Sequence, residues 1–159
     1  MKYLEDFPLG ERRKLGTTSL SEADVVRFAT EFDPQPFHLD AGAAAASIYG
    51  GLIASGWHTC ALTMRVLVDG FLADSASMGS PGIDELRWLK PVRPGDTLTV
   101  YGTVVEVQLS KSKPDRGFLH NLTEVENQAG EVVMSMRGKT MIKRRDPAHG
   151  VATPEAAAP

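Results

Sequence analysis

Hydrophobic residues recur with the periodicity of a helix along residues 53–72, in the first half of the chain. At about 100° per residue, one face of this segment collects Ile53, Gly56, Cys60, Met64, Leu67 and Phe71. The opposite side carries a narrow polar stripe of His58, Arg65 and Asp69. An amphipathic helix buries its apolar face and leaves its polar stripe in solvent. We therefore expect residues 55–72 to form the central helix of the fold.

Two shorter helices are expected before it. Ser21 is a suitable N-cap, followed by acidic residues in the first turn and then by apolar positions. This helix should end near Phe32, because Pro34 and Pro36 are incompatible with a continuing helix. The alanine-rich residues 40–49 predict a second short helix.

The second half of the chain shows the alternation of strands. Apolar and polar residues alternate, with many threonines and valines, over residues 83–89, 97–107, 118–126 and 132–142. Helices followed by a run of strands predict an α+β domain with a long antiparallel sheet curled over the central helix. We expect residues 1–145 to form this single domain and residues 146–159 to be a disordered C-terminal tail.

Composition narrows the functional classes. The chain has 159 residues, of which 42% are hydrophobic and 23% charged, and a formal net charge of −3. The chain has no excess of basic residues that would attract nucleic acid and no sequence motif for binding nucleotide phosphates. The only cysteine, Cys60, leaves no disulfide and no cysteine-based zinc site. With no secretory signal and an apolar stretch interrupted by charges, we expect a cytoplasmic protein with no membrane, nucleic-acid or metal partner.

The segment DPQPFHLD, residues 33–40, carries candidate chemistry. Asp33 and His38 are separated by two prolines, which restrict the backbone and reduce the entropy lost when the segment becomes ordered. Both side chains could then reach one water molecule, as general acid–base chemistry requires. The alternative is a surface turn without catalytic role. Asp40 could orient His38, but an N-cap for the next helix is the favoured interpretation.

The glycine-rich residues 50–56 lead into the central helix. The backbone N–H of Gly56 would be open to a ligand at a helix N-terminus, where the helix dipole favours negative charge. That position suits a carbonyl oxygen that becomes negative during a reaction. The simpler interpretation is that these glycines turn the chain and allow close packing.

Together, these segments resemble the MaoC-like dehydratase family, which includes the R-specific enoyl-CoA hydratases. The family pattern is an aspartate, a proline-containing turn, a histidine five residues on, a second aspartate, and then a glycine that begins a long hydrophobic helix. Residues 33–40 and Gly56 carry this pattern here. The sequence KPVRPGD at residues 90–96 is similar to the family's turn between strands. The resemblance spans about residues 10–143.

The resemblance implies a hot-dog fold and a homodimer or dimer of dimers. It also implies an acyl thioester substrate on coenzyme A (CoA) or an acyl carrier, and no cofactor other than the CoA of the substrate. In such an enzyme, Asp33 and His38 activate water for addition across the 2,3 double bond of an enoyl thioester. The N–H of Gly56 polarises the thioester carbonyl.

Two positions depart from the family pattern. Gln35 stands where asparagine is usual, and Ser55 stands where a histidine commonly precedes the helix glycine. Both are candidate substrate-binding residues. Three cations of an expected hairpin loop, Lys111, Lys113 and Arg116, are further candidates, since they could meet the phosphates of CoA. A solvated turn is the alternative for that loop.

Two other functions remain open. A hot-dog thioesterase would hydrolyse the thioester, but such enzymes usually place a carboxylate on or beside the central helix. Residues 52–64 contain no aspartate or glutamate, which favours the hydratase. A non-catalytic subunit that binds acyl thioesters is the second alternative.

Overall fold

The computed structural model describes residues 1–147. All of the predicted tail except its first two positions lies outside the described residues, so the boundary at residue 145 stays a prediction.

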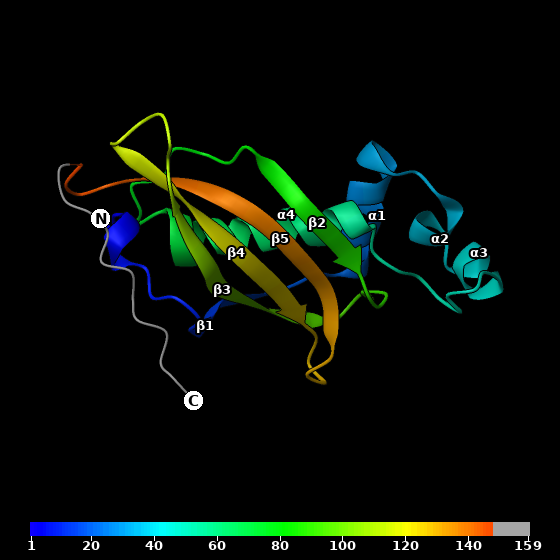
Figure 1. The fold of residues 1–159 in the computed structure, drawn as a ribbon. Coiled ribbons are helices and arrows are strands. Elements are labelled where there is room, and N and C mark those ends of the chain that lie inside the picture. The colour runs from blue at the N-terminus through cyan, green and yellow to red at the C-terminus, as the bar shows by residue number, and fades with distance from the viewer. Residues whose placement is uncertain (148–159) are drawn as a thin grey trace.

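Five strands of this region form one antiparallel sheet in the order β1-β3-β4-β5-β2 (Figure 1). Their bounds are β1 Arg12–Ser19, β2 Gly82–Trp88, β3 Thr97–Leu109, β4 Arg116–Glu126 and β5 Val132–Lys143. The four predicted strands are present, and β1 is an additional edge strand. Its sequence, RRKLGTTS, begins with three consecutive positions occupied by charged residues, and only Leu15 offers a large apolar side chain. It therefore lacks the alternation that identified the others.

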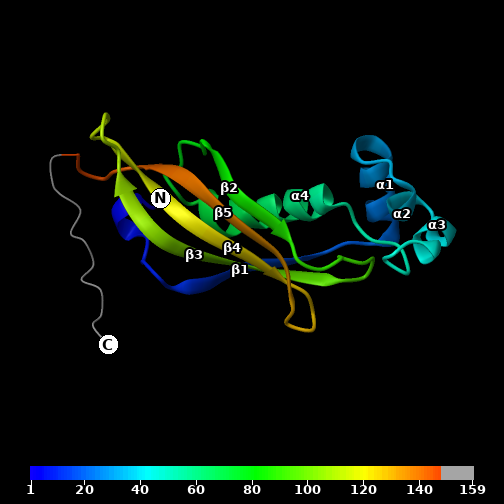
Figure 2. The ribbon, with the colours of Figure 1, turned by 45° about the vertical axis from the view of Figure 1, so that its right-hand side comes forward.

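The helices form two groups. The first group lies beyond one end of the sheet and comprises α1 (Glu22–Phe32), α2 (Pro36–Leu39) and α3 (Ala41–Ala46) (Figure 2). The second is the central helix α4 (Gly56–Leu67), which the π-helical turn Val68–Leu72 extends. The sheet curls over this helix (Figures 1 and 2). The α+β architecture predicted from the sequence is thus confirmed.

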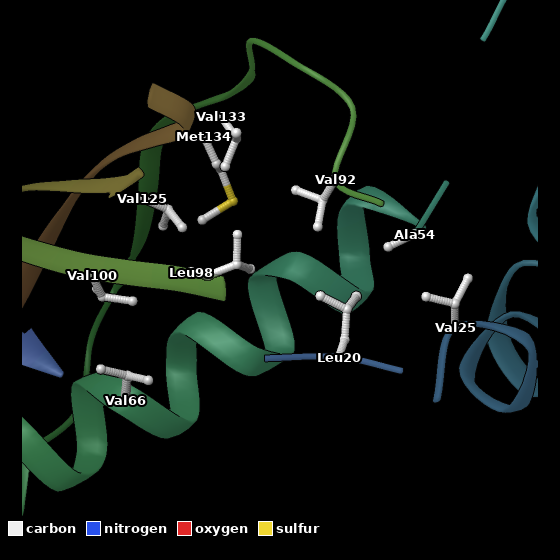
Figure 3. Packing of buried hydrophobic residues seen from close by; sticks show 10 residues of the cluster. All are labelled: Leu20, Val25, Ala54, Val66, Val92, Leu98, Val100, Val125, Val133 and Met134. Carbon is white, nitrogen blue, oxygen red and sulfur yellow. The ribbon is translucent and has the colours of Figure 1, made fainter. Parts of the chain in front are cut away.

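The main core lies between α4 and the sheet and reaches α1 through Val25 (Figure 3). Val66 of α4 packs there with residues of three strands, β3, β4 and β5, with Val25 of α1, and with residues of the connecting loops. The buried members are Leu20, Val25, Ala54, Val66, Val92, Leu98, Val100, Val125, Val133 and Met134.

The face of α4 that is buried is not the one expected from the sequence. The buried residues of this helix are His58, Thr59, Thr63 and Val66, whereas Met64 on the predicted apolar face is 47% exposed. Small threonines allow close packing, and the hydroxyl of Thr63 is satisfied within the helix, because it donates a 2.8 Å hydrogen bond to the carbonyl of Thr59. His58, placed in the solvated stripe by the sequence, instead stacks on Phe28 of α1 with ring centroids 4.6 Å apart.

Candidate active site

The loop that joins α1 to α2 is fixed by its own backbone. Asp33 is the C-cap of α1, and its N–H donates to the carbonyl of Ala29 at 2.9 Å. Gln35 N–H then donates to the Asp33 carbonyl at 2.8 Å, and Pro36 occupies the first turn of α2, where its missing N–H costs nothing. The two prolines therefore act as expected, ending one helix and starting the next.

This loop brings Asp33 and His38 together. Asp33 Oδ2 and His38 Nε2 are 3.4 Å apart, and His38 is only 4% exposed. The other ring nitrogen, Nδ1, lies 2.8 Å from the carbonyl oxygen of Ile53. Since a carbonyl oxygen can only accept, Nδ1 carries a proton, and in the neutral ring Nε2 is then an acceptor. With the ring in this neutral form, two acceptor atoms face each other, an arrangement that a shared proton donor such as water satisfies.

Two side chains hold the carboxylate of Asp33. Ser55 Oγ donates to Oδ2 at 2.7 Å, and Gln35 Nε2 donates to Oδ1 at 2.7 Å. The hydrogen bond from Ser55 is the largest cause that lowers the pKa of Asp33, assisted by Gln35 and His38 and opposed by partial burial. Ser55 and Gln35, expected from the sequence to bind substrate, therefore bind the candidate catalytic carboxylate in this structure.

Gly56 begins α4 beside the same group. Ser55 is the N-cap of this helix, and its Oγ accepts a hydrogen bond from Trp57 N–H at 3.2 Å. In the part of the chain that is described, the Gly56 N–H has no hydrogen-bond acceptor. Trp88 Nε1 donates to the Gly56 carbonyl at 3.0 Å, and a Cβ at position 56 would lie 2.4 Å from the indole. Close packing against Trp88 thus requires glycine here, whether or not its N–H binds a ligand.

These groups line one cavity, which we call the dyad cavity, with a volume of about 530 Å³. Asp33, His38 and Gly56 reach it from three different segments, and the rings of Trp57 and Trp88 flank it. The cavity has room for a small organic ligand as well as water.

The remaining predicted residues lie elsewhere. Asp40 is the N-cap of α3, and its Oδ1 accepts from Ala43 N–H at 2.7 Å, which confirms the favoured interpretation. Lys111, Lys113 and Arg116 belong to the β3–β4 hairpin, at the end of the sheet opposite α1–α3 (Figure 1). Arg116 is paired with Asp115 at 2.8 Å. Within one chain, these cations are therefore not brought to the dyad cavity, and their contact with CoA stays a prediction.

Two groups at the site were not identified from the sequence. The Ile53 carbonyl orients His38, but every residue has a backbone carbonyl, so the sequence does not show which one makes this contact. Trp88 covers Gly56, and the only signal for that contact was a glycine at the start of an otherwise bulky helix. Among the described residues, no group of three or more His, Cys, Asp or Glu side chains has the arrangement of a metal site. No helix in residues 1–147 is long and apolar enough to cross a membrane.

A long antiparallel sheet wrapped around one helix is the hot-dog fold, and the Asp/His pair lies beside the start of that helix. The chain belongs to the MaoC like domain family, which it matches over residues 6–126.

Solved structures support this assignment. The MaoC-like dehydratase from Rhodospirillum rubrum is 45% identical, with a TM-score of 0.85, over 92% of this chain and 99% of that one. The unliganded R-hydratase PhaJ1 from Pseudomonas aeruginosa is 29% identical, with a TM-score of 0.69, over 89% of this chain and 86% of that one. The uncharacterized protein YdeM of Bacillus subtilis is 34% identical over 89% of this chain and 99% of its own length. These relatives confirm the hot-dog fold and support a hydratase or dehydratase in general terms.

Proposed function

We propose that the chain catalyses the reversible addition of water across the 2,3 double bond of an enoyl thioester, giving a 3-hydroxyacyl thioester. The observation that carries the proposal is the convergence of two acceptors, Asp33 Oδ2 and His38 Nε2, at 3.4 Å in the dyad cavity. A water molecule that donates one hydrogen to each acceptor has its oxygen lone pairs directed away from them. That oxygen is then oriented for attack on C3 of the substrate.

The proposed reaction uses only groups of this site and the substrate. As the water oxygen bonds to C3, one acceptor takes a water proton, and the π electrons move toward the thioester oxygen. The Gly56 N–H, at the N-terminus of α4, donates to that oxygen as it becomes negative. A proton then returns from the dyad to C2, which restores the carbonyl. CoA enters as part of the substrate, and no further cofactor takes part in this scheme.

The position of the carboxylate favours water addition over thioester hydrolysis. Asp33 lies after α1, and the helix α4 (Gly56–Leu67) contains no aspartate or glutamate. A hydrolase of this fold would need an activated nucleophile near the carbonyl carbon, beside α4. In the proposed arrangement, the dyad is instead directed at the double bond next to that carbonyl.

The test is water addition to a panel of 2-enoyl-CoA thioesters, followed by loss of the conjugated absorbance, with thiol release measured in the same samples. We expect absorbance loss without thiol release. Asp33→Asn and His38→Ala should each lower kcat/KM by at least about 100-fold, a usual contribution of general acid–base groups.

Asp40→Asn is the matched control, because it makes the same substitution at a helix cap outside the dyad, where asparagine also caps well. It should retain activity. Thiol release would show a thioesterase, and no turnover of any enoyl-CoA would favour a binding subunit. Either result would contradict the proposal.

A further inference from the structure

A second and larger cavity, of about 620 Å³, lies under the sheet, along α4. We call it the sheet cavity. Cys60, Met64 and Leu67 line it from the helix, and Met134 and Met136 of β5 line it from the sheet. These five side chains are apolar, so the part of the sheet cavity between α4 and β5 suits an alkyl chain rather than a polar ligand.

The sheet cavity and the dyad cavity have one lining residue in common within residues 1–147, and it is Trp57. Gly56 begins α4 at the dyad cavity, and Cys60 is the next residue of the helix after Trp57 that lines the sheet cavity. Side chains of a helix lean toward its N-terminus. The indole of Trp57 therefore lies at the end of the sheet cavity that faces Gly56, between the two cavities.

A second indole holds the ring of Trp57 in this position. The rings of Trp57 and Trp88 meet edge to face, with centroids 5.4 Å apart and an interplanar angle of 78°. Trp88 is itself anchored, because its Nε1 donates to the Gly56 carbonyl at 3.0 Å. Edge-to-face aromatic pairs contribute more than their buried area alone. Trp57 is more than half exposed, but this pairing keeps its ring at the junction.

The inner wall of the dyad cavity is closed. Ala54, Val92 and Val133 line it, and these three residues of the main core are at most 5% exposed. Thr59, which also lines it, is 2% exposed. A close-packed core leaves no passage for an alkyl chain. A ligand too long for the dyad cavity thus reaches further apolar space within this chain only past Trp57.

We propose that Trp57 is a specificity-determining residue that closes the sheet cavity to the acyl chain and restricts the enzyme to thioesters of short 2-enoic acids. The inference rests on the proposed function for the placement of the thioester, with its carbonyl at the Gly56 N–H and C3 beside Asp33 and His38. From that position, the carbons beyond C3 reach Cys60 only if the Trp57 indole is displaced.

Removal of the indole should join the two cavities. Cys60 and Met64 follow Gly56 one and two turns along α4. Met64 is therefore about 12 Å along the helix axis from Gly56, at a rise of about 1.5 Å per residue. The joined space would offer a longer acyl chain an apolar wall along both turns of the helix.

The test compares kcat/KM for crotonyl-CoA and octenoyl-CoA, the four- and eight-carbon 2-enoyl thioesters, in the parent and in Trp57→Ala. We expect the parent to favour crotonyl-CoA at least about tenfold, and Trp57→Ala to shift the ratio toward octenoyl-CoA at least about tenfold. One methylene in an apolar pocket already changes specificity by about 10–200-fold. Trp57→Phe, which keeps a ring at the junction, should shift the ratio less. Equal use of both substrates by the parent, or an unchanged ratio in Trp57→Ala, would overturn the inference.

Met64→Trp is the matched control, because it fills the sheet cavity two turns beyond Trp57. Met64 is 47% exposed, so a larger side chain can be accommodated. In the parent it should leave kcat/KM for both substrates unchanged, since the acyl chain does not extend that far. Added to Trp57→Ala, it should abolish the gain for octenoyl-CoA. A gain that persisted would show that the longer chain takes another path, and the role given to Trp57 would be wrong.

Binding of saturated thioesters separates this inference from the proposed function. Calorimetry with butyryl-CoA and octanoyl-CoA measures the same restriction without a reaction. The affinity for octanoyl-CoA relative to butyryl-CoA should rise at least about tenfold in Trp57→Ala and return to the parent's value in the double variant. This change in binding without hydration of any enoyl-CoA would contradict the proposed reaction alone. Hydration with a chain-length preference that is independent of Trp57 would contradict this inference alone.

Discussion

At the scale of single residues, the chemistry of the site depends on how one carboxylate is held. Ser55 and Gln35 donate to different oxygens of Asp33, and the resulting stabilisation of the charged form lowers its pKa. Asp33 is therefore ionised at neutral pH and keeps accepting capacity for water. Because its pKa is lower in the folded chain, the Asp33 carboxylate also stabilises the fold at pH values above about 3.8, its pKa in the unfolded chain. That contribution is lost as the pH falls through the lowered folded-state pKa.

Ser55→Ala should move the acid limb of the pH profile of kcat/KM to higher pH. The substitution removes the hydrogen bond that contributes most to the lowered pKa of Asp33, so the carboxylate is protonated at a higher pH. At neutral pH we expect kcat/KM to fall about tenfold, because hydrogen bonds to charged groups contribute about 1.5–3 kcal/mol. Steady-state kinetics from pH 4 upward would measure both effects.

Ser21→Ala is the control for this prediction. Ser21 caps α1 as Ser55 caps α4, but it does not touch Asp33. Its loss should lower stability by about 1 kcal/mol and leave the acid limb in place. If both variants moved the limb equally, a general loss of helix capping would explain the result, and the role given to Ser55 would be wrong.

At the scale of elements, the contact between α1 and α4 joins the helix that carries Asp33 to the helix that begins with Gly56. His58 of α4 is 6% exposed, stacks on Phe28 of α1, and has no hydrogen-bond partner for its Nδ1. Burial lowers the pKa of His58, Asp24 opposes that shift, and Arg27 adds to it. The ring is therefore packed in its neutral form.

The free energy of unfolding should consequently fall as the pH drops below about 6.5, the value expected for histidine in the unfolded chain. Between that value and the lowered folded-state pKa, the unfolded chain binds the extra proton, so stability rises with pH by up to about 1.4 kcal/mol per pH unit. His58→Phe keeps the stacked ring and removes the titration. Urea unfolding at a series of pH values should show a flatter dependence for this variant.

A second histidine serves as the control for the urea experiment. His120 lies on β4, away from the α1–α4 contact, and interacts with Gln108 and Glu106. His120→Gln should leave the His58-dependent slope in place. A slope unchanged in His58→Phe would exclude His58 as its source.

The elements themselves differ in how far the sequence predicts them. Residues 55–72 and the four strands of the second half follow clear periodicities, and all are present. β1 was missed because an edge strand beginning with three charged positions has little alternation. The prediction of which face of α4 is buried was wrong, because hydrophobicity ranks Thr59 and Thr63 below Met64. Close packing instead selects side chains that are small and internally satisfied.

The candidate site also has some parts that the sequence predicts and others that it does not. Asp33, His38 and Gly56 were grouped from their residue types, the prolines between the first two and the family resemblance, and the structure brings all three to one cavity. The partners of Asp33 were not identified in this way, because the contact between Ser55 and Asp33 joins residues 22 positions apart. The Ile53 carbonyl that sets the tautomer of His38 was invisible for a different reason, since every residue has a carbonyl. Long-range contacts and backbone groups therefore had to come from the structure.

At the scale of the whole molecule, the sheet ends in two edge strands, β1 and β2. An edge strand presents unpaired backbone groups and is a template for pairing with another chain. β2 also has apolar side chains near this edge: Ile83 is 55% exposed, and Trp88 and the following Leu89 are about half exposed. Exposed apolar residues beside an open edge are typical of an interface between subunits.

We expect two copies to pair through their β2 strands in an isologous dimer, as the resemblance to hot-dog proteins implied. Light scattering should give a mass of twice 17.2 kDa. Ile83→Asp should raise the dissociation constant at least about tenfold, because it places a charge in an interface that would exclude water. Val105→Asp is the matched control. Val105 is similarly exposed, at 42%, but it lies on β3, a strand that is not at an edge of the sheet. A monomeric parent would exclude this pairing, whereas a dimer disrupted only by Val105→Asp would place the interface on the outer face of the sheet instead of its edge.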